Sequence, residues 1–144
     1  MDRTDYQILN ILQRDCRMTL KYIGDRVGLT APAVSERIKR MEETGVIQGF
    51  RIEVDRRRLQ SNITGFIWVA PEPDKYDRFC QFCKQEPSIL AHYHTIGVYN
   101  ALLRFAVADT RELEKVLAEI KHYGNSQTSV ELETYFDSKE IPIP

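Results

Sequence analysis

The sequence predicts an α+β protein with a winged-type helix-turn-helix domain followed by a ferredoxin-like βαββαβ domain. Residues 19–49 have the order short helix, tight turn, longer helix and strand, which is the pattern of a helix-turn-helix. Residues 63–136 have the order strand, helix, strand, strand, helix, strand, which is the ferredoxin-like order. We therefore expect a DNA-binding domain at residues 1–49, a strand and linker at 50–62, and a second domain at 63–144.

The first domain begins with an amphipathic helix, expected over Thr4–Arg14 because apolar residues recur along one face. A short helix follows, and its glycines Gly24 and Gly28 lie four residues apart. This spacing leaves a face without bulk near the end of that helix. We expect the next helix, over Ala31–Thr44, to cross that face closely.

The helix after the turn is the predicted recognition helix, the one that enters the major groove of DNA. Thr30 is its expected N-cap, Pro32 suits its first turn, and Gly45 suits the position after its end. Apolar residues at i, i+4 and i+7 form a stripe that faces the core.

The opposite side of this helix, with Ala33 and Arg37 on its flank, carries side chains that suit DNA. Arg37 can bind guanine in a bidentate manner, Glu36 can accept from cytosine, and Ala33 can touch a thymine methyl group. Lys39 and Arg40 lie further along and suit phosphates. The predicted DNA-binding residues are Thr30, Pro32, Ala33, Ser35, Glu36, Arg37, Lys39 and Arg40. The alternative is a solvated charged face of a small helical bundle.

Charge is distributed unevenly along the chain. Residues 1–62 contain 12 lysines and arginines against 9 acids, whereas residues 63–144 contain 8 against 12. This asymmetry places the expected contact with double-stranded DNA in the N-terminal half. Because the excess of +3 is small, we expect weak binding by one copy and useful affinity from a dimer.

The segment between the domains has two parts. Residues 46–54 alternate in a strand-like way and predict a β-hairpin arm or connector. Residues 55–62 are polar and predict a linker, whose arginines Arg56, Arg57 and Arg58 either touch phosphates or belong to a solvated hinge.

The second domain is expected to contain four strands and two helices. Strands are expected over Ile63–Ala70, Ile89–Ile96, Ala101–Ala108 and Gln127–Phe136, with one helix over Asp74–Gln85 and another capped by Asp109 or Thr110. Helices of this fold cover one face of the sheet. Leu102 and Ala106 make the other face partly apolar, and pairing with a second copy would hide it.

Composition bounds the class of protein. A hydrophobic content of 42% and a charged content of 28% are values of a globular chain. The charged start of the chain does not match a signal peptide, and no apolar run is long enough for a bilayer. Three cysteines, an odd number, argue against a secreted disulfide framework. We expect a cytoplasmic protein with no membrane partner.

Two cysteines and two histidines lie within residues 80–94. Cys80 and Cys83 form a C-x-x-C, with His92 and His94 close behind, and two cysteines with two histidines can hold zinc. The spacing is not that of a zinc finger, and both cysteines fall on the apolar stripe of a helix. We therefore predict no metal site and no cofactor. The chain has no G-x-S-x-G, H-E-x-x-H or P-loop motif, so no enzyme is predicted.

The whole chain resembles the Lrp/AsnC family of bacterial and archaeal transcription regulators. Five runs of residues in the first domain carry this resemblance, together with the βαββαβ order of the second. The runs are Asp2–x–x–Asp5–x–x–Ile8–Leu9, Asp15–Cys16–Arg17–Met18–Thr19, Val27–Gly28–Leu29–Thr30, Arg37–Ile38–Lys39–Arg40–Met41–Glu42 and Gly45–Val46–Ile47–Gln48–Gly49–Phe50. The resemblance implies a dimer through the sheets, assembled further into tetramers or octamers. It also implies that amino acids or related metabolites bind between dimers, with an effector-independent or architectural DNA-binding protein as the alternative.

The resemblance also points to an effector site between the second and third strands. The family motif has a glycine and, three residues on, an acid; here Gly97 is retained and Asn100 replaces the acid. An amide has no charge to pair with a ligand ammonium, so either the effector differs or the site is weak or unused. The predicted effector-binding residues are Gly97, Val98, Tyr99 and Asn100, and the alternative is a plain hairpin turn.

Overall fold

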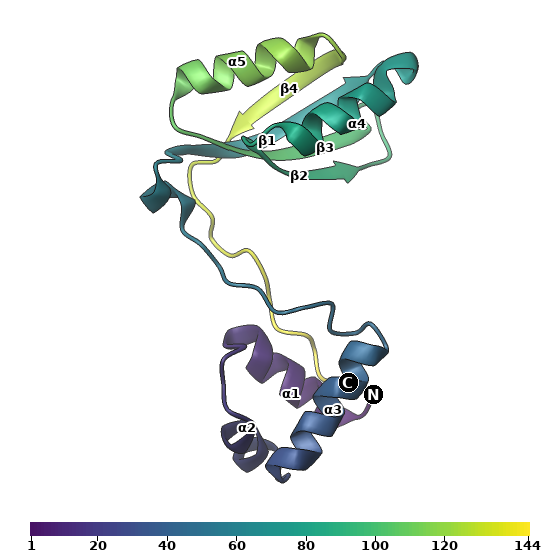
Figure 1. Cartoon of the computed structure of the whole chain (residues 1–144), viewed down its shortest axis with the longest axis vertical. Helices are drawn as coiled ribbons and strands as arrows, with labels where there is room; N and C mark the ends of the chain where they lie inside the picture. The colour runs from purple at the N-terminus through teal and green to yellow at the C-terminus, as the bar shows by residue number, and fades with distance from the viewer. The chain divides into compact units, whose positions relative to one another are not determined.

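The computed structural model describes residues 1–144, except for the side chain of Arg57. The chain forms two compact units, coloured along the chain in Figure 1. The first unit contains residues 1–53 together with 136–144, and the second contains residues 54–135. The predicted boundaries differ, because they assigned the last nine residues to the second domain.

Three helices form the body of the first unit. They are α1 (Arg3–Arg14), α2 (Leu20–Val27) and α3 (Ala31–Glu43). Their buried residues, which include Ile8, Ile23, Val34 and Met41, form one hydrophobic core. The predicted helix-turn-helix is confirmed.

Each helix begins at a side chain that caps it. Asp2 accepts from the backbone of Asp5, and Asp5 accepts from the backbone of Asp2, which is a reciprocal capping box for α1. Thr30 accepts from the backbone of Ala33 and caps α3 as predicted. Gly45 follows the end of α3 with φ +73°, a backbone conformation that glycine adopts without strain.

Gly24 in α2 allows the predicted close approach of the chain that enters α3, whereas Gly28, directly after α2, has a separate role. A Cβ at Gly24 would lie 2.4 Å from the backbone oxygen of Leu29, so Gly24 makes room for the turn. Gly28 has open space around it and ends α2 with φ +72°. The spacing of the pair therefore reflects a tight turn followed by a helix end.

The strand predicted over residues 46–54 is wrong. Residues 46–47 form a bend and residues 48–54 form no regular structure, and the described part of the first unit contains no strand that would make a wing. A strand needs a hydrogen-bonded neighbour, which alternation in the sequence cannot supply. The apolar residues of this segment consequently stay exposed, Ile52 at 82% and Phe50 at 48%.

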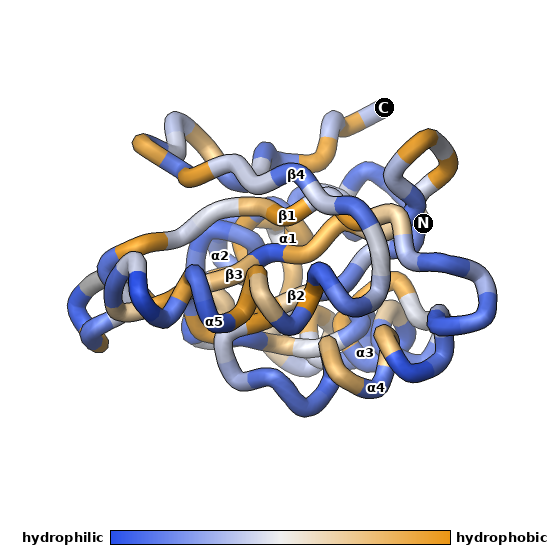
Figure 2. Tube along the Cα trace, turned by 90° about the horizontal axis from the view of Figure 1, so that it is seen from above, coloured by the Kyte–Doolittle hydropathy of each residue, from blue (hydrophilic) through white to orange (hydrophobic). Residues whose placement is uncertain are grey.

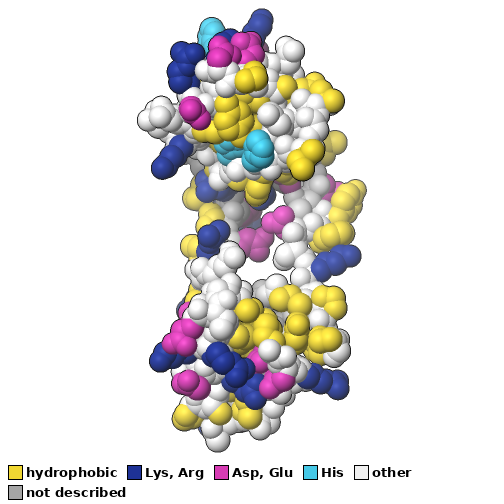
Figure 3. Space-filling model, turned by 90° about the vertical axis from the view of Figure 1, so that its right-hand side faces the viewer, with side chains coloured by type: hydrophobic (Ala, Val, Ile, Leu, Met, Phe, Trp, Pro, Cys, Tyr) yellow, Lys and Arg dark blue, Asp and Glu magenta, His cyan; other side chains and the backbone are white. Residues whose placement is uncertain are grey.

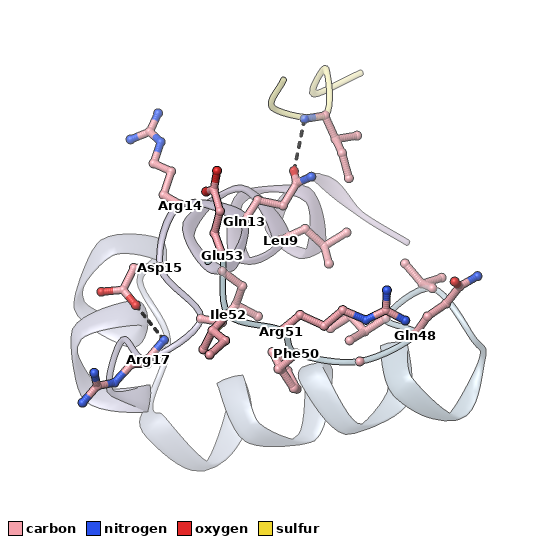
Figure 4. Close-up of a pocket in the computed structure, with 16 residues that line it drawn as sticks. Leu9, Gln13, Arg14, Asp15, Arg17, Gln48, Phe50, Arg51, Ile52 and Glu53 are labelled. Carbon is pink, nitrogen blue, oxygen red and sulfur yellow. Dashed lines mark hydrogen bonds between the residues drawn. The ribbon is translucent and has the colours of Figure 1, made fainter. Parts of the chain in front are cut away.

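The end of the chain completes the first unit. The Asn10 side chain donates to the backbone oxygen of Ile141 at 3.0 Å and accepts from its backbone nitrogen at 3.0 Å. Gln13 also accepts from that nitrogen, as the dashed line in Figure 4 shows. Arg14 pairs with Glu140 at 2.5 Å, and Ile141 packs against the core of the unit.

The second unit is a four-stranded antiparallel sheet with two helices on one face (Figure 1). The strand order is β2-β3-β1-β4, which confirms the ferredoxin-like class. In chain order, its elements are the 3-10 turn η1 (Arg56–Leu59), β1 (Ile63–Pro71), η2 (Pro73–Lys75), α4 (Tyr76–Gln85), β2 (Ile89–His94), β3 (Ala101–Val107), α5 (Thr110–Lys121) and β4 (Gly124–Val130). The last strand ends six residues before the predicted Phe136, because residues beyond Glu131 have no pairing partner on β1.

The two faces of the sheet differ in composition. Ile67, Val69, Leu103 and Phe105 point toward α4 and α5 and form the core. The alternate residues of the same strands point to the other face, where Trp68 lies opposite Leu102. Figure 2 shows that β1 is largely hydrophobic along its length. The second face is thus apolar at its centre and carries no helix.

Candidate nucleic-acid interface

Helix α3 presents a polar side to solvent, as predicted. Pro32, Ser35, Glu36 and Lys39 are exposed, while Ala33 is half-buried. Lys39 lies 3.7 Å from Glu43, one turn further along. Figure 3 shows basic and acidic side chains interleaved on the visible face of the first unit.

Two of the predicted DNA-binding residues turn back toward α1. Arg37 donates to Asp2 and to Asp5 at 2.7 Å each, and Arg40 donates to both carboxylate oxygens of Asp5 at 3.2 and 3.0 Å. The Asp5 side chain is completely buried, whereas the Arg40 side chain is 56% exposed. Arg37 is therefore engaged within the protein, while Arg40 retains an exposed guanidinium.

The ion pairs change the acidity of the groups involved. Arg37 is the main reason why the pKa of Asp2 lies below its ordinary value. Burial acts to raise the pKa of Asp5, but hydrogen bonds from the Asp2 backbone and Arg37 outweigh it, so the pKa is lowered. Hydrogen bonds to the side chains of Asp2 and Asp5 raise the pKa of Arg37.

Sequence reasoning missed this cluster. Asp5 and Arg37 are separated by 32 residues, and no local pattern links them. Acids in the first turn of a helix suggest only a favourable interaction with the helix dipole. The pairing of Asp5 with Arg37 can be predicted only when α1 and α3 are known to pack together.

The predicted effector segment forms the β2–β3 hairpin of the second unit. Thr95 closes the turn, since its backbone donates to the backbone oxygen of Asn100 and its hydroxyl donates to that of Tyr99. Gly97 has φ +149°. The side-chain oxygen of Asn100 is buried without a hydrogen-bond partner among the described groups, which leaves a buried acceptor facing no donor.

Hollows occur elsewhere in both units. A groove of about 600 Å³ in the first unit is lined by α1, the α1–α2 turn, residues 46–53 and Ile141 (Figure 4). A cavity of about 300 Å³ in the second unit is lined by residues from α4 and β2, including Cys80, Cys83 and His92. Neither hollow is lined by the predicted effector residues.

The cysteine and histidine residues do not form a metal cluster. Cys83 is buried in the core and Cys80 packs against it, as predicted from the helical stripe. Among the side chains that the structure describes, no group of three or more His, Cys, Asp or Glu is arranged to hold a metal. None of the described helices is both long and apolar enough to span a bilayer.

Comparison with known proteins matches both units in order. Residues 1–42 match the AsnC-type helix-turn-helix domain, and residues 64–141 match the Lrp/AsnC ligand binding domain. The uncharacterized HTH-type transcriptional regulator YezC of Bacillus subtilis (strain 168) is 30% identical over 132 residues, covering 92% of this chain and 94% of YezC. The HTH-type transcriptional regulator FL11 of Pyrococcus furiosus is 30% identical over 146 residues, covering 99% of this chain and 97% of FL11.

Solved structures share the fold. LrpC of B. subtilis superposes with a TM-score of 0.89 at 24% identity, covering 96% of this chain and 99% of LrpC. The complex of the Neisseria meningitidis regulator NMB0573 with L-Met superposes with a TM-score of 0.90 at 21% identity, covering 99% and 96%. With two domain models matched in order and relatives at 30% identity over nearly its whole length, the chain belongs to the Lrp/AsnC family of HTH-type transcriptional regulators.

Proposed function

We propose that this protein is a sequence-specific DNA-binding regulator that reads the major groove with α3. The observation that supports this most is the exposed polar side of α3, a capped helix directly after a tight turn. A regulator of this kind acts on DNA, so we place the protein in the cytoplasm and propose that it is not an enzyme.

The DNA-binding residues divide by their chemistry. Pro32, Ala33, Ser35 and Glu36 lie in the first turns of α3 and would face base edges, where Glu36 can accept from cytosine. The backbone around Thr30, together with Lys39 and Arg40, would contact phosphates. Arg37, which the sequence suggested as a guanine reader, is moved to a supporting role because it is bound to Asp2 and Asp5.

The protein is proposed to bind as a dimer. The helix-free face of the sheet carries Trp68 and Leu102 at its centre and Tyr93 beside them, and Tyr93 is 53% exposed. Burying this face against a second copy removes an apolar surface from water. Two recognition helices would then read half-sites about one helical turn apart or a multiple of it, and dimers would assemble further into tetramers or octamers.

An amino acid or related metabolite is the proposed effector, bound between dimers near Gly97, Val98, Tyr99 and Asn100. The buried oxygen of Asn100, which faces no donor, supports a ligand that donates a hydrogen bond. The related NMB0573 was solved with L-Met. Effector binding would shift DNA affinity by a coupling free energy of about 1–3 kcal/mol.

The test is selection of bound duplexes from a genomic DNA library by the purified full-length protein, followed by sequencing. We expect enrichment of palindromic sites, and a changed enrichment with one pool of amino acids. Uniform, salt-sensitive recovery of all fragments would instead support an architectural protein that needs no effector, which the uncharged Asn100 favours. Recovery of no DNA would overturn the proposal.

Variants refine the test on an enriched site. Lys39→Ala should weaken binding to every sequence and lower the salt slope by about 0.9, because one phosphate contact is lost. Glu36→Gln should instead relax the preference at one base pair by about 1–3 kcal/mol. Lys84→Ala on α4 is the matched control, since Lys84 is exposed in the second unit. Equal effects of Lys39→Ala and Lys84→Ala would show that α3 is not the contact.

A further inference from the structure

We propose that Asp5 is a positioning residue for DNA reading: it holds Arg37 away from the DNA and fixes the rotation of α3. This inference rests on the proposed function, because it concerns what α3 presents to DNA. It gives a buried acid on the first helix a role in specificity.

The Asp5 carboxylate has every acceptor position occupied. Its Oδ1 accepts from Arg37 at 2.7 Å and from Arg40 at 3.2 Å. Its Oδ2 accepts from the Asp2 backbone at 2.9 Å and from Arg40 at 3.0 Å. Three donor groups, with the Nη2 of Arg40 shared between both oxygens, thus make four contacts with the ionised carboxylate. Because both oxygens of the buried carboxylate are engaged, Asp5 restricts the positions of the Arg37 and Arg40 side chains.

This geometry fixes how α3 is turned about its own axis. Arg37 and Arg40 are three residues apart, so they project from the same side of the helix on successive turns. Both reach the same carboxylate, and a rotation of α3 would break at least one of these bonds. The best-attested use of a buried ion pair is to fix how two elements are aligned. Its net contribution to folding stability is often small.

The two arginines differ in what remains for DNA. The Arg37 side chain is only 26% exposed and contacts two carboxylates, whereas the Arg40 side chain is 56% exposed. A guanidinium that is already neutralised by carboxylates releases few counterions when DNA binds. Arg37 therefore adds little to non-specific affinity while Asp5 is ionised.

Removing the charge of Asp5 should consequently increase non-specific binding. In Asp5→Asn the neutral amide cannot replace the carboxylate as acceptor for both arginines. Arg37 keeps only its half-exposed partner Asp2, so Arg37 and Arg40 gain freedom to contact phosphates. We expect tighter binding to a scrambled duplex, a salt slope steeper by about 1, and a specificity ratio lower by about tenfold. A residue that only stabilised the fold would weaken binding to both duplexes and leave the slope unchanged.

The experiment measures Kd for a selected site and for its scrambled version over a series of salt concentrations, with full-length protein. Asp25→Asn is the matched control: it makes the same charge change on an exposed residue of the same unit. An equal rise in slope for Asp25→Asn would overturn the inference, because net charge alone would then explain it. An unchanged specificity ratio for Asp5→Asn would overturn it too.

A second pair of variants keeps the test decisive if Asp5→Asn does not fold. Arg37→Gln should change the salt slope much less than Lys39→Gln, because the charge of Arg37 is already balanced by Asp2 and Asp5. Equal slope changes for the two would overturn the inference. If the wild-type protein itself does not distinguish the two duplexes, the proposed function fails, which is a separate outcome.

Discussion

The side chain of Asn10 binds both the backbone N–H and the backbone oxygen of Ile141, 131 residues further along the chain. An amide side chain can satisfy a peptide unit in this way only when the chain lies alongside it in an extended conformation. The last residues are thus held by a specific contact on α1, with Ile141 packed against the core.

Removing this contact should destabilise the first unit. Asn10→Ala leaves the backbone oxygen of Ile141 without its partner and its N–H with only the longer hydrogen bond to Gln13, at a cost of about 1–3 kcal/mol. The measurement is urea unfolding followed by circular dichroism, with Asn125→Ala on β4 as a control because Asn125 is exposed. Deletion of residues 136–144 should cost more than Asn10→Ala. Equal stability of the deletion variant and the full chain would show that the tail contact is incidental.

Acid should weaken the attachment of α3 to α1. The pKa of Asp5 is lowered in the folded protein from an ordinary value of 3.8. Its stabilising contribution is therefore present above pH 3.8 and is lost as the pH falls below that value through the folded pKa. Asp2, Arg37 and Arg40 face this carboxylate, and the pKa of Asp2 is lowered as well.

Unfolding free energies of the wild-type protein and Asp5→Asn, measured from neutral to strongly acidic pH, check this expectation. The difference between them should be constant near neutrality and shrink below about pH 4. A difference that stays constant into strong acid would contradict the role of the ionised carboxylate.

Cys83 should resist thiol reagents in the folded protein. Burial raises the pKa of its thiol to about 12, and the thiolate is the reactive form. Mass spectrometry after brief alkylation at neutral pH should find Cys83 unmodified, with Cys16 and Cys80 reacting faster because they are only half-buried. After unfolding in denaturant, all three should react alike. Rapid labelling of native Cys83 would mean that α4 opens readily.

Trp68 offers a test of the proposed dimer. It lies at the centre of the helix-free face of the sheet, opposite Leu102 on β3 and Gln127 on β4. Trp68→Lys places a charge there, so in sedimentation velocity we expect a monomer from this variant and a dimer or larger species from the wild-type protein. Glu119→Lys on the exposed side of α5 is the control. A dimeric Trp68→Lys variant would direct the search to another surface.

Local patterns predict most of the elements and few of the long-range contacts. The helix containing Val34 and Met41 was predicted within one residue, because its apolar spacing lies inside it and its cap and terminal glycine lie directly beside its two ends. The strand at Phe50 was not, because alternation signals a strand only where a partner strand exists. The bonds of Asp5 with Arg37, and of Asn10 with Ile141, join distant segments that only the fold brings together.

The predicted DNA-binding set shows the same division. Lys39 and Glu36 are exposed on α3, as helical periodicity alone requires. Arg37 was predicted on the flank of that side, and the carboxylates of Asp2 and Asp5 hold it there. A periodic pattern states which side of a helix a residue lies on, but not which neighbours occupy that side.

The tail contact also sets an order of events during synthesis. A ribosome completes α1, α2 and α3 long before it adds Ile141, because the whole second unit is made between them. Until that residue emerges, Asn10 has no peptide to bind and one side of the helical core stays open. We therefore expect the nascent first unit to be less stable toward unfolding than the finished one. It reaches its full stability only after the chain has also supplied the sheet through which dimers are proposed to form.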